Sequence, residues 1–188
     1  MRLLADPAAF LDASDPAIRR LAVSACVAAG LDDRLAGEIC GIAEGDSDGS
    51  VRAMAIEALG GIAPPCTGVL QAARRDDDPR VIEALATAYG ELGDRDAVPW
   101  LIELATGDAD RASREAAVAA LGAIGDPSAL PVLLDLVDTG PAQVRRRAVV
   151  ALTVFDDPAV EPAIRRATAD RNPSVRETAE MVVGRTPS

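Results

Sequence analysis

A short sequence pattern recurs six times along the chain, and this recurrence is the strongest constraint on the fold. The first copy reads "DPAIRRLAV" and a later one "DPRVIEALA". The copies begin at residues 15, 48, 78, 110, 141 and 172, so they are spaced by 33, 30, 32, 31 and 31 residues. A period in this range predicts a solenoid, because one small unit cannot bury its own apolar face and must stack on its neighbours.

Each repeat predicts two helices, of which the third copy is the clearest example. Asp78 followed by Pro79 is typical of a helix start, with Asp as the N-cap and Pro at the first helical position. Apolar residues then recur on one helical face, at Val81, Leu85, Ala88 and Leu92. Gly93 is expected to end this A helix in a left-handed conformation. The segment "AVPWLIELAT" forms the second helix, the B helix, and ends at Gly107.

The predicted fold class is therefore all-α, an α-solenoid (superhelix) of about five to six stacked antiparallel helix pairs. We expect one domain over residues 1–188, with a short helix near Pro7–Leu11 before the pairs and the most irregular point at Gly60–Gly61 and Pro64–Pro65. The repeats lie near 15–45, 46–76, 77–107, 108–138 and 139–169, with a terminal half-repeat at 170–188.

Two rows of A-helix residues predict how the repeats stack. The small row is Ala22, Ala55, Leu85, Ala117, Ala148 and Ala179. The large row, one turn later, is Cys26, Leu59, Tyr89, Leu121, Leu152 and Val183. A small row beside a large row lets neighbouring helices nest, and each buried large side chain contributes about 1.5–3 kcal/mol.

Composition and charge exclude several function classes. The net charge of −11 repels phosphate backbones and argues against nucleic-acid binding. Residues 1–94 carry a net −8 and residues 95–188 a net −3, so a partner with a basic surface is favoured. All 19 basic residues are Arg, a usage typical of a GC-rich bacterial genome. Without His or Lys there is no ordinary catalytic triad and no Schiff base, so no enzyme is predicted.

The cysteines, the acidic loops and the lack of long apolar segments argue against further kinds of site and location. Cys26, Cys40 and Cys66 form no C-x-x-C pair, and we expect buried free thiols in a reducing compartment. The acidic loops around Asp46 and Asp76 lack calcium-loop spacing, so neither metal nor cofactor is predicted. No segment has the length and apolarity of a membrane span or signal peptide, which favours a cytoplasmic location.

The repeat pattern resembles the HEAT repeat, and the match is clearest in "REAAVAALGAIGDPSALPVLLDLV" at residues 114–137. The period near 31 residues is similar to the short HEAT-like subclass named after phycobilisome lyases. This resemblance implies a protein-binding scaffold whose B helices line the concave side. Some members of the family bind bilins as lyases or isomerases. A distant DNA-repair group needs a basic concave face, from which this acidic chain departs.

One row of B-helix positions suggests where a partner binds. Trp100, the single Trp, shares this row with Val69 and Val132, while Glu103 and Asp135 follow one turn later. An exposed Trp flanked by Val side chains, with acidic residues at the rim, is a candidate hot spot. The alternative is that Trp100 is partly buried between neighbouring B helices.

Each copy of the pattern has an anchor position, occupied by Ile18 in the first copy and Val51 in the second, and an arginine follows it in five of the six repeats. These residues are Arg19, Arg52, Arg114, Arg145 and Arg176, and the third repeat has Ile82 instead. We interpret them as a structural Asp–Arg ladder in which each guanidinium bridges capping carboxylates or carbonyls within and between repeats, with Asp15, Asp48 and Asp110 standing four residues earlier in three repeats. The alternative interpretation is an arginine stripe for an anionic ligand.

The sequence thus favours a non-catalytic protein-binding scaffold or adaptor that uses the concave B-helix face. The alternative is a lyase-like or chaperone-like accessory protein that holds a bilin or assists another enzyme's cofactor. Visible absorbance of the purified protein, or retention of added tetrapyrrole, would favour that alternative. The sequence does not fix the oligomeric state.

Overall fold

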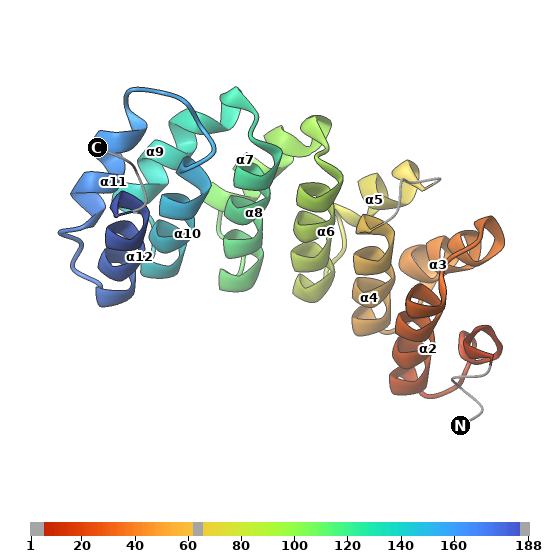
Figure 1. The fold of residues 1–188 in the computed structure, drawn as a ribbon. Coiled ribbons are helices and arrows are strands. Elements are labelled where there is room, and N and C mark those ends of the chain that lie inside the picture. Colours follow the sequence, from red (N-terminus) through yellow and green to blue (C-terminus); the bar gives the residue numbers. More distant parts are fainter. Residues whose placement is uncertain (1–5, 62–65, 185–188) are drawn as a thin grey trace. The chain divides into compact units, whose positions relative to one another are not determined.

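The computed structural model describes residues 6–61 and 66–184, and within these ranges it contains helices and turns but no strand (Figure 1). A and B helices alternate, as the repeat pattern predicts. The A helices are α2 (Pro16–Ala29), α4 (Gly49–Gly60), α6 (Pro79–Leu92), α8 (Arg111–Ile124), α10 (Ala142–Leu152) and α12 (Pro173–Val183). The B helices are α3 (Asp33–Gly45), α5 (Thr67–Ala73), α7 (Val98–Thr106), α9 (Leu130–Thr139) and α11 (Val160–Ala167). The fold is therefore the predicted all-α, α-solenoid class.

Carboxylate and amide caps set most of the helix starts. The Asp15 side chain accepts a hydrogen bond from the Ala17 N–H, and the Asp48 side chain accepts one from the Ser50 N–H, both at 2.8 Å. Each cap satisfies a backbone donor that has no partner inside the helix. At the C-terminal end of α6, Gly93 has a φ of 64°, which is the left-handed conformation predicted for it.

Short 3₁₀ turns precede two of the B helices, a feature that the sequence pattern did not predict. They are η2 (Arg95–Ala97) before α7 and η3 (Pro127–Ala129) before α9. The predicted helix near residues 7–11 is also a 3₁₀ turn, η1 (Pro7–Phe10). Of the expected irregular point, Gly60 ends α4 and Gly61 caps it, while Pro64 and Pro65 lie outside the described residues.

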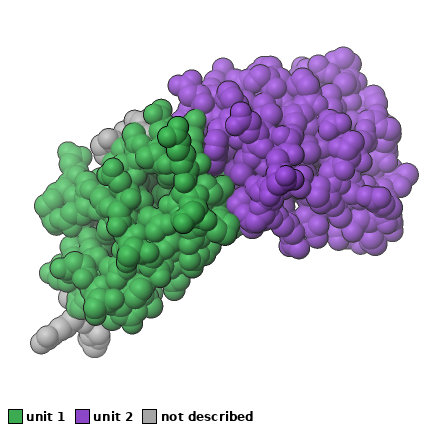
Figure 2. Space-filling view, turned by 180° about the vertical axis from the view of Figure 1, so that it is seen from behind, with its two compact units in different colours: residues 1–88 green, residues 89–188 purple. Residues whose placement is uncertain are grey.

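The chain divides into two compact units, residues 1–88 and 89–188, and the boundary falls within α6 (Figure 2). In the first unit α2 packs against α4, and α3 packs against both α4 and α5. In the second unit α8, α10 and α12 lie side by side, and the B helices α7, α9 and α11 each pack against the A helix that follows (Figure 1). The prediction of one domain stays a prediction.

The core includes the two predicted rows. All six members of the small row and five of the large row are buried, and Val183 is half-buried. Small residues bring the A helices of the second unit into close contact. A Cβ at Gly122 of α8 would lie 2.7 Å from the Cα of Ala151 in α10. In the described part of the chain, the helices are too short or too polar to cross a membrane.

Candidate protein-binding surface

The predicted surface divides between the two units. Trp100 and Glu103 lie on α7, and Val132 and Asp135 occupy the equivalent positions on α9, all within the second unit. Val69 lies on α5 in the first unit. The two parts are therefore described separately, and the proposed contact surface stays a prediction for each of them.

Trp100 is half-buried, and its ring packs edge-on against Tyr89. The two ring centroids are 5.7 Å apart and the ring planes are inclined by 66°. Because Tyr89 is 1% exposed, this contact fixes one edge of Trp100 on the core and leaves part of the indole at the surface. Trp100 is thus half-buried against a residue of the A helix α6. A partly packed aromatic side chain loses little conformational entropy when a partner covers it.

The polar residues beside Trp100 are exposed carboxylates. Glu103 and Asp135 both lie at the surface, and Val132 is half-buried like Trp100. One oxygen of Asp135 accepts a hydrogen bond from the Thr139 hydroxyl at 3.1 Å, which orients the carboxylate along α9. The B-helix surface of the second unit thus presents half-buried apolar side chains together with negative charge.

In the first unit, Val69 lines a groove of about 640 Å³ beside α3 and α5. Two exposed carboxylates, Asp33 and Glu44, also line this groove. No Cβ placed at Gly37 or at Gly68 would touch another atom, so both glycines leave the helix backbone open to a partner. The groove is apolar at Val69 and acidic at Asp33 and Glu44.

The prediction of three free thiols is wrong for two of the cysteines. Cys40 of α3 and Cys66, at the start of α5, form a disulfide with their Cα atoms 6.2 Å apart. The two cysteines stand 26 positions apart in the sequence and share no short motif, so only the packing of α3 beside α5 brings the sulfurs together. Cys26 is a buried free thiol, and burial raises its pKa. The disulfide removes the support that free thiols gave to a reducing compartment.

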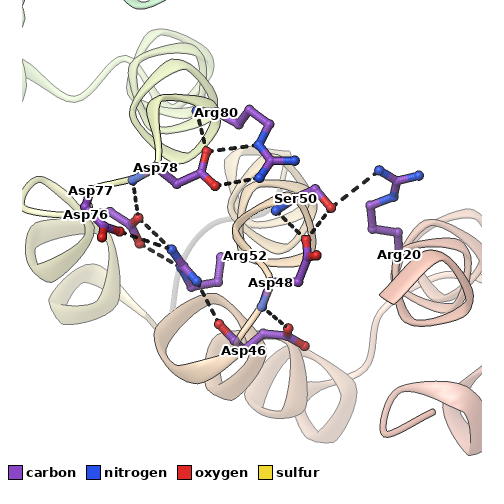
Figure 3. Close-up of polar contacts among 9 residues, drawn as sticks. All are labelled: Arg20, Asp46, Asp48, Ser50, Arg52, Asp76, Asp77, Asp78 and Arg80. Atoms are coloured by element: carbon purple, nitrogen blue, oxygen red, sulfur yellow. Dashed lines mark hydrogen bonds and ion pairs between the residues drawn. The ribbon is translucent and has the colours of Figure 1, made fainter. Parts of the chain in front are cut away.

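Three arginines of the predicted ladder each bind an aspartate in the loop that precedes the next A helix. Arg19 donates from Nε and Nη2 to the two oxygens of Asp46, each at 2.7 Å. Arg52 binds Asp76 in the same way, also at 2.7 Å (Figure 3). Such bidentate pairs are strong because the planar guanidinium matches both carboxylate oxygens. Each pair ties one A helix to the loop before the next one.

Arg145 and Asp170 form the corresponding pair in the second unit, and it is the most buried of the three. Nε and Nη2 of Arg145 bind the two Asp170 oxygens at 2.7 Å, and Nη1 donates to the Gly140 carbonyl at 2.8 Å. The side chains of Arg145 and Asp170 are 3% and 10% exposed. One Asp170 oxygen also accepts the Asn172 N–H at 2.7 Å, so the carboxylate is held from both sides.

The other two arginines of the row bind backbone carbonyls. Nε of Arg114 donates to the Ala105 carbonyl at 3.2 Å. Nη1 of Arg176 donates to the carbonyl of Asp170 at 2.8 Å. The residue that would match Asp46 or Asp76 for Arg114 is Thr139, which carries no charge.

The partner carboxylates are not the ones that the sequence suggested. Asp15, Asp48 and Asp110 serve as N-caps. The ion pairs go to Asp46, Asp76 and Asp170, each two residues before a cap. A signal for them exists in the sequence, because the spacing Asp-x-Asp or Asp-x-Asn recurs at these three loops. The first residue of each spacing accepts the N–H of the third.

The ion pairs make the folded chain sensitive to acid. Hydrogen bonds from Arg19 hold the pKa of Asp46 below its usual value, and Arg145 does the same to the pKa of Asp170. For Asp76, burial favours a higher pKa, but the bonds from Arg52 and the Asp78 N–H outweigh it. All three carboxylates are therefore expected to stay ionised in the folded state at a pH where they take up protons in the unfolded chain.

We expect the free energy of unfolding to fall as the pH drops below about 4, the ordinary pKa of Asp. Below that pH the unfolded chain binds more protons than the folded chain, until the folded carboxylates also protonate. Denaturant titrations across this range measure the effect, and the matched variant Asp46→Asn should show a shallower loss. An identical pH dependence in the two proteins would contradict this assignment.

Two further basic residues near Arg145, on α11, are paired with carboxylates. Arg165 binds Glu161 at 2.7 Å, and Arg166 binds Asp138 at 2.8 Å. Among the described residues, no group of three or more Asp, Glu or Cys side chains is arranged to hold a metal ion. What the B helices offer is therefore a mixed apolar and acidic surface.

Comparison with known proteins agrees with this architecture. The sequence model of HEAT repeats matches residues 66–153. This part of the chain, 88 of its 188 residues, consists of HEAT-like repeats. No curated protein sequence matches it.

Solved structures share the fold over nearly the whole chain. CpcE and CpcF of phycocyanin lyase from Nostoc sp. PCC7120 give a TM-score of 0.73 at 23% identity, covering 94% of this chain and 74% of that one. A designed armadillo repeat protein in complex with the peptide (KR)4 gives 0.66 at 16% identity, covering 98% and 99%. Armadillo repeat proteins designed for modular peptide recognition give 0.64 at 16%, covering 96% and 98%. The likeness extends to repeat scaffolds that bind peptides.

Proposed function

We propose that this HEAT-like protein is a non-catalytic scaffold that binds a basic segment of another protein through its B-helix surface. The observation that carries the proposal is the combination of half-buried Trp100 with the exposed carboxylates of Glu103 and Asp135 on α7 and α9. An aromatic anchor beside negative charge suits a basic segment, because the indole face and the carboxylates both attract cationic side chains. The groove beside α3 and α5 offers the same chemistry in the first unit.

Two further facts support this function. A chain without His and Lys lacks the most frequent general base, imidazole, and the lysine amine nucleophile. The net charge of −11 accelerates encounters with basic partners. The armadillo complex with (KR)4 is a related fold that holds a basic peptide, which makes that peptide a suitable first probe.

The test is a titration of (KR)4 into the purified protein at low and moderate salt. We expect the double variant Glu103→Arg/Asp135→Arg to bind the peptide about tenfold more weakly, because two attractive charges become repulsive. Both residues are exposed, so the free energy of unfolding should change by no more than about 0.5 kcal/mol. Isothermal titration calorimetry and chemical denaturation measure the two quantities.

A matched control separates the local surface from the general charge. The double variant Glu177→Arg/Glu180→Arg changes the net charge equally, but on exposed positions of the A helix α12. It should retain most of the peptide affinity. If the two double variants lose affinity equally, or the unmodified chain does not bind (KR)4 at any salt concentration, the proposed surface is wrong.

A second candidate function is an accessory protein that holds a bilin or assists another enzyme's cofactor. The structural likeness to the phycocyanin lyase proteins favours it. The two functions separate in one measurement, since a tetrapyrrole-binding protein acquires visible absorbance when mixed with the pigment and a peptide-binding scaffold does not.

A further inference from the structure

The Cys40–Cys66 disulfide lies in the wall of the α3–α5 groove. Both cysteines line it together with Val69 and the carboxylates of Asp33 and Glu44. Both cysteines are largely buried, Cys40 at 8% and Cys66 at 7% exposed, and the small part that stays exposed borders the groove. A disulfide that solvent reaches is open to attack by an external thiolate.

The helix at one end of this bond has few other attachments. With seven residues, α5 is the shortest α-helix in the described part of the chain, and its N-cap is Cys66, which makes no side-chain capping bond. A helix of this length is unstable in isolation. Burial of Leu70 and Ala73 holds its body, whereas the disulfide holds its first turn to α3. Cys66 is thus both a partner in the disulfide and the residue at which α5 begins.

We propose that Cys40 and Cys66 form a thiol–disulfide exchange site that controls whether the α3–α5 groove holds a basic segment. The gating rests on the proposed function, whereas the exchange chemistry does not. With the bond intact, the first turn of α5 stays against α3 and keeps Val69 beside Asp33 and Glu44. After reduction, Cys66 no longer anchors that turn, and the groove loses its fixed shape.

The co-reactant is a dithiol reductant. Its first thiolate attacks one sulfur of the disulfide, the bond between the two cysteines breaks, and the other cysteine leaves as a thiolate that takes up a proton. The second thiol of the reductant loses its proton and attacks the resulting mixed disulfide, which releases the remaining cysteine as a thiolate that is protonated in turn. Two electrons pass to the protein, and the reductant ends as a disulfide.

The experiment compares the oxidised and reduced full-length chain by hydrogen exchange, with and without (KR)4. Alkylation after unfolding should label one cysteine in the oxidised chain, Cys26, and all three after dithiothreitol. We expect the amides of α5 to exchange about tenfold faster after reduction, while those of α8 are unchanged. The peptide should protect α3 and α5 in the oxidised chain and lose about tenfold in affinity for that site on reduction.

Two variants serve as controls. Cys40→Ser/Cys66→Ser should behave as the reduced chain whether or not dithiothreitol is present, and Cys26→Ser should keep the full redox response. The exchange site is overturned if all three cysteines are labelled in the oxidised chain, or if α5 exchanges equally in both states. If α5 responds to reduction but the peptide protects α3 and α5 in neither state, the gating fails and the exchange site stands. The proposed function fails with the gating only if the peptide also leaves α7 and α9 unprotected.

Discussion

Arg145→Ala should lower the free energy of unfolding by about 3–5 kcal/mol, the usual cost of removing one partner of a buried ion pair. The guanidinium is 3% exposed and makes two bonds to Asp170 and one to the Gly140 carbonyl. Its removal leaves the Asp170 carboxylate, whose side chain is only 10% exposed, without its cation. Denaturant titration followed by circular dichroism measures the loss.

Two arginines provide the controls for this variant. Arg147 lies on the same helix but is exposed, so Arg147→Ala should change stability by about 0.5 kcal/mol or less. Arg114→Ala should fall between the two, since its Nε bonds one carbonyl at 3.2 Å and no aspartate. If Arg145→Ala were as mild as Arg147→Ala, the row would have no structural role, and an anionic ligand would become the better explanation of it.

Much of the fold follows from local rules that the sequence displays. Asn172-Pro173 and Asp78-Pro79 start α12 and α6 where a cap and a first-turn proline predict them. The apolar period identifies the buried rows correctly, because a helix turned to bury any other face would expose these apolar side chains to solvent. The 3₁₀ turns before α7 and α9 escaped prediction, since Asp followed by Pro or Arg fits both a 3₁₀ turn and an α-helical first turn.

The site was less predictable because it depends on contacts between segments. Nothing near Cys40 indicates that Cys66 would lie within disulfide reach. The ladder aspartates stand 24–27 residues from their arginines, so their pairing appears only when successive A helices stack. The contact of Trp100 with Tyr89 likewise joins a B helix to the large row of the A helices, and the period of either helix alone does not indicate it. Residue type and local period are visible in the sequence, whereas partner choice between repeats is not.

Gly122→Ala should destabilise the protein by about 1–3 kcal/mol, although alanine is the better helix former. Within an open helix the same change would stabilise by about 0.5–1 kcal/mol. At Gly122, however, the new Cβ would lie 2.7 Å from both the Cα and the Cβ of Ala151. Carbon atoms pack best at about 3.5–4.0 Å, and neither atom of Ala151 can rotate away. The helices α8 and α10 must therefore separate, and the buried contacts beside them weaken.

Gly41→Ala is the matched control, because a Cβ at Gly41 on α3 would have no other atom within 4 Å. It should raise the free energy of unfolding by about 0.5–1 kcal/mol, the ordinary gain for alanine inside a helix. Opposite signs for one and the same substitution can come only from tertiary contact, since helix propensity acts equally at both positions. If Gly122→Ala also stabilised the protein, the close approach of α8 and α10 would be wrong, and with it the nesting of small residues that sets the spacing of the repeats.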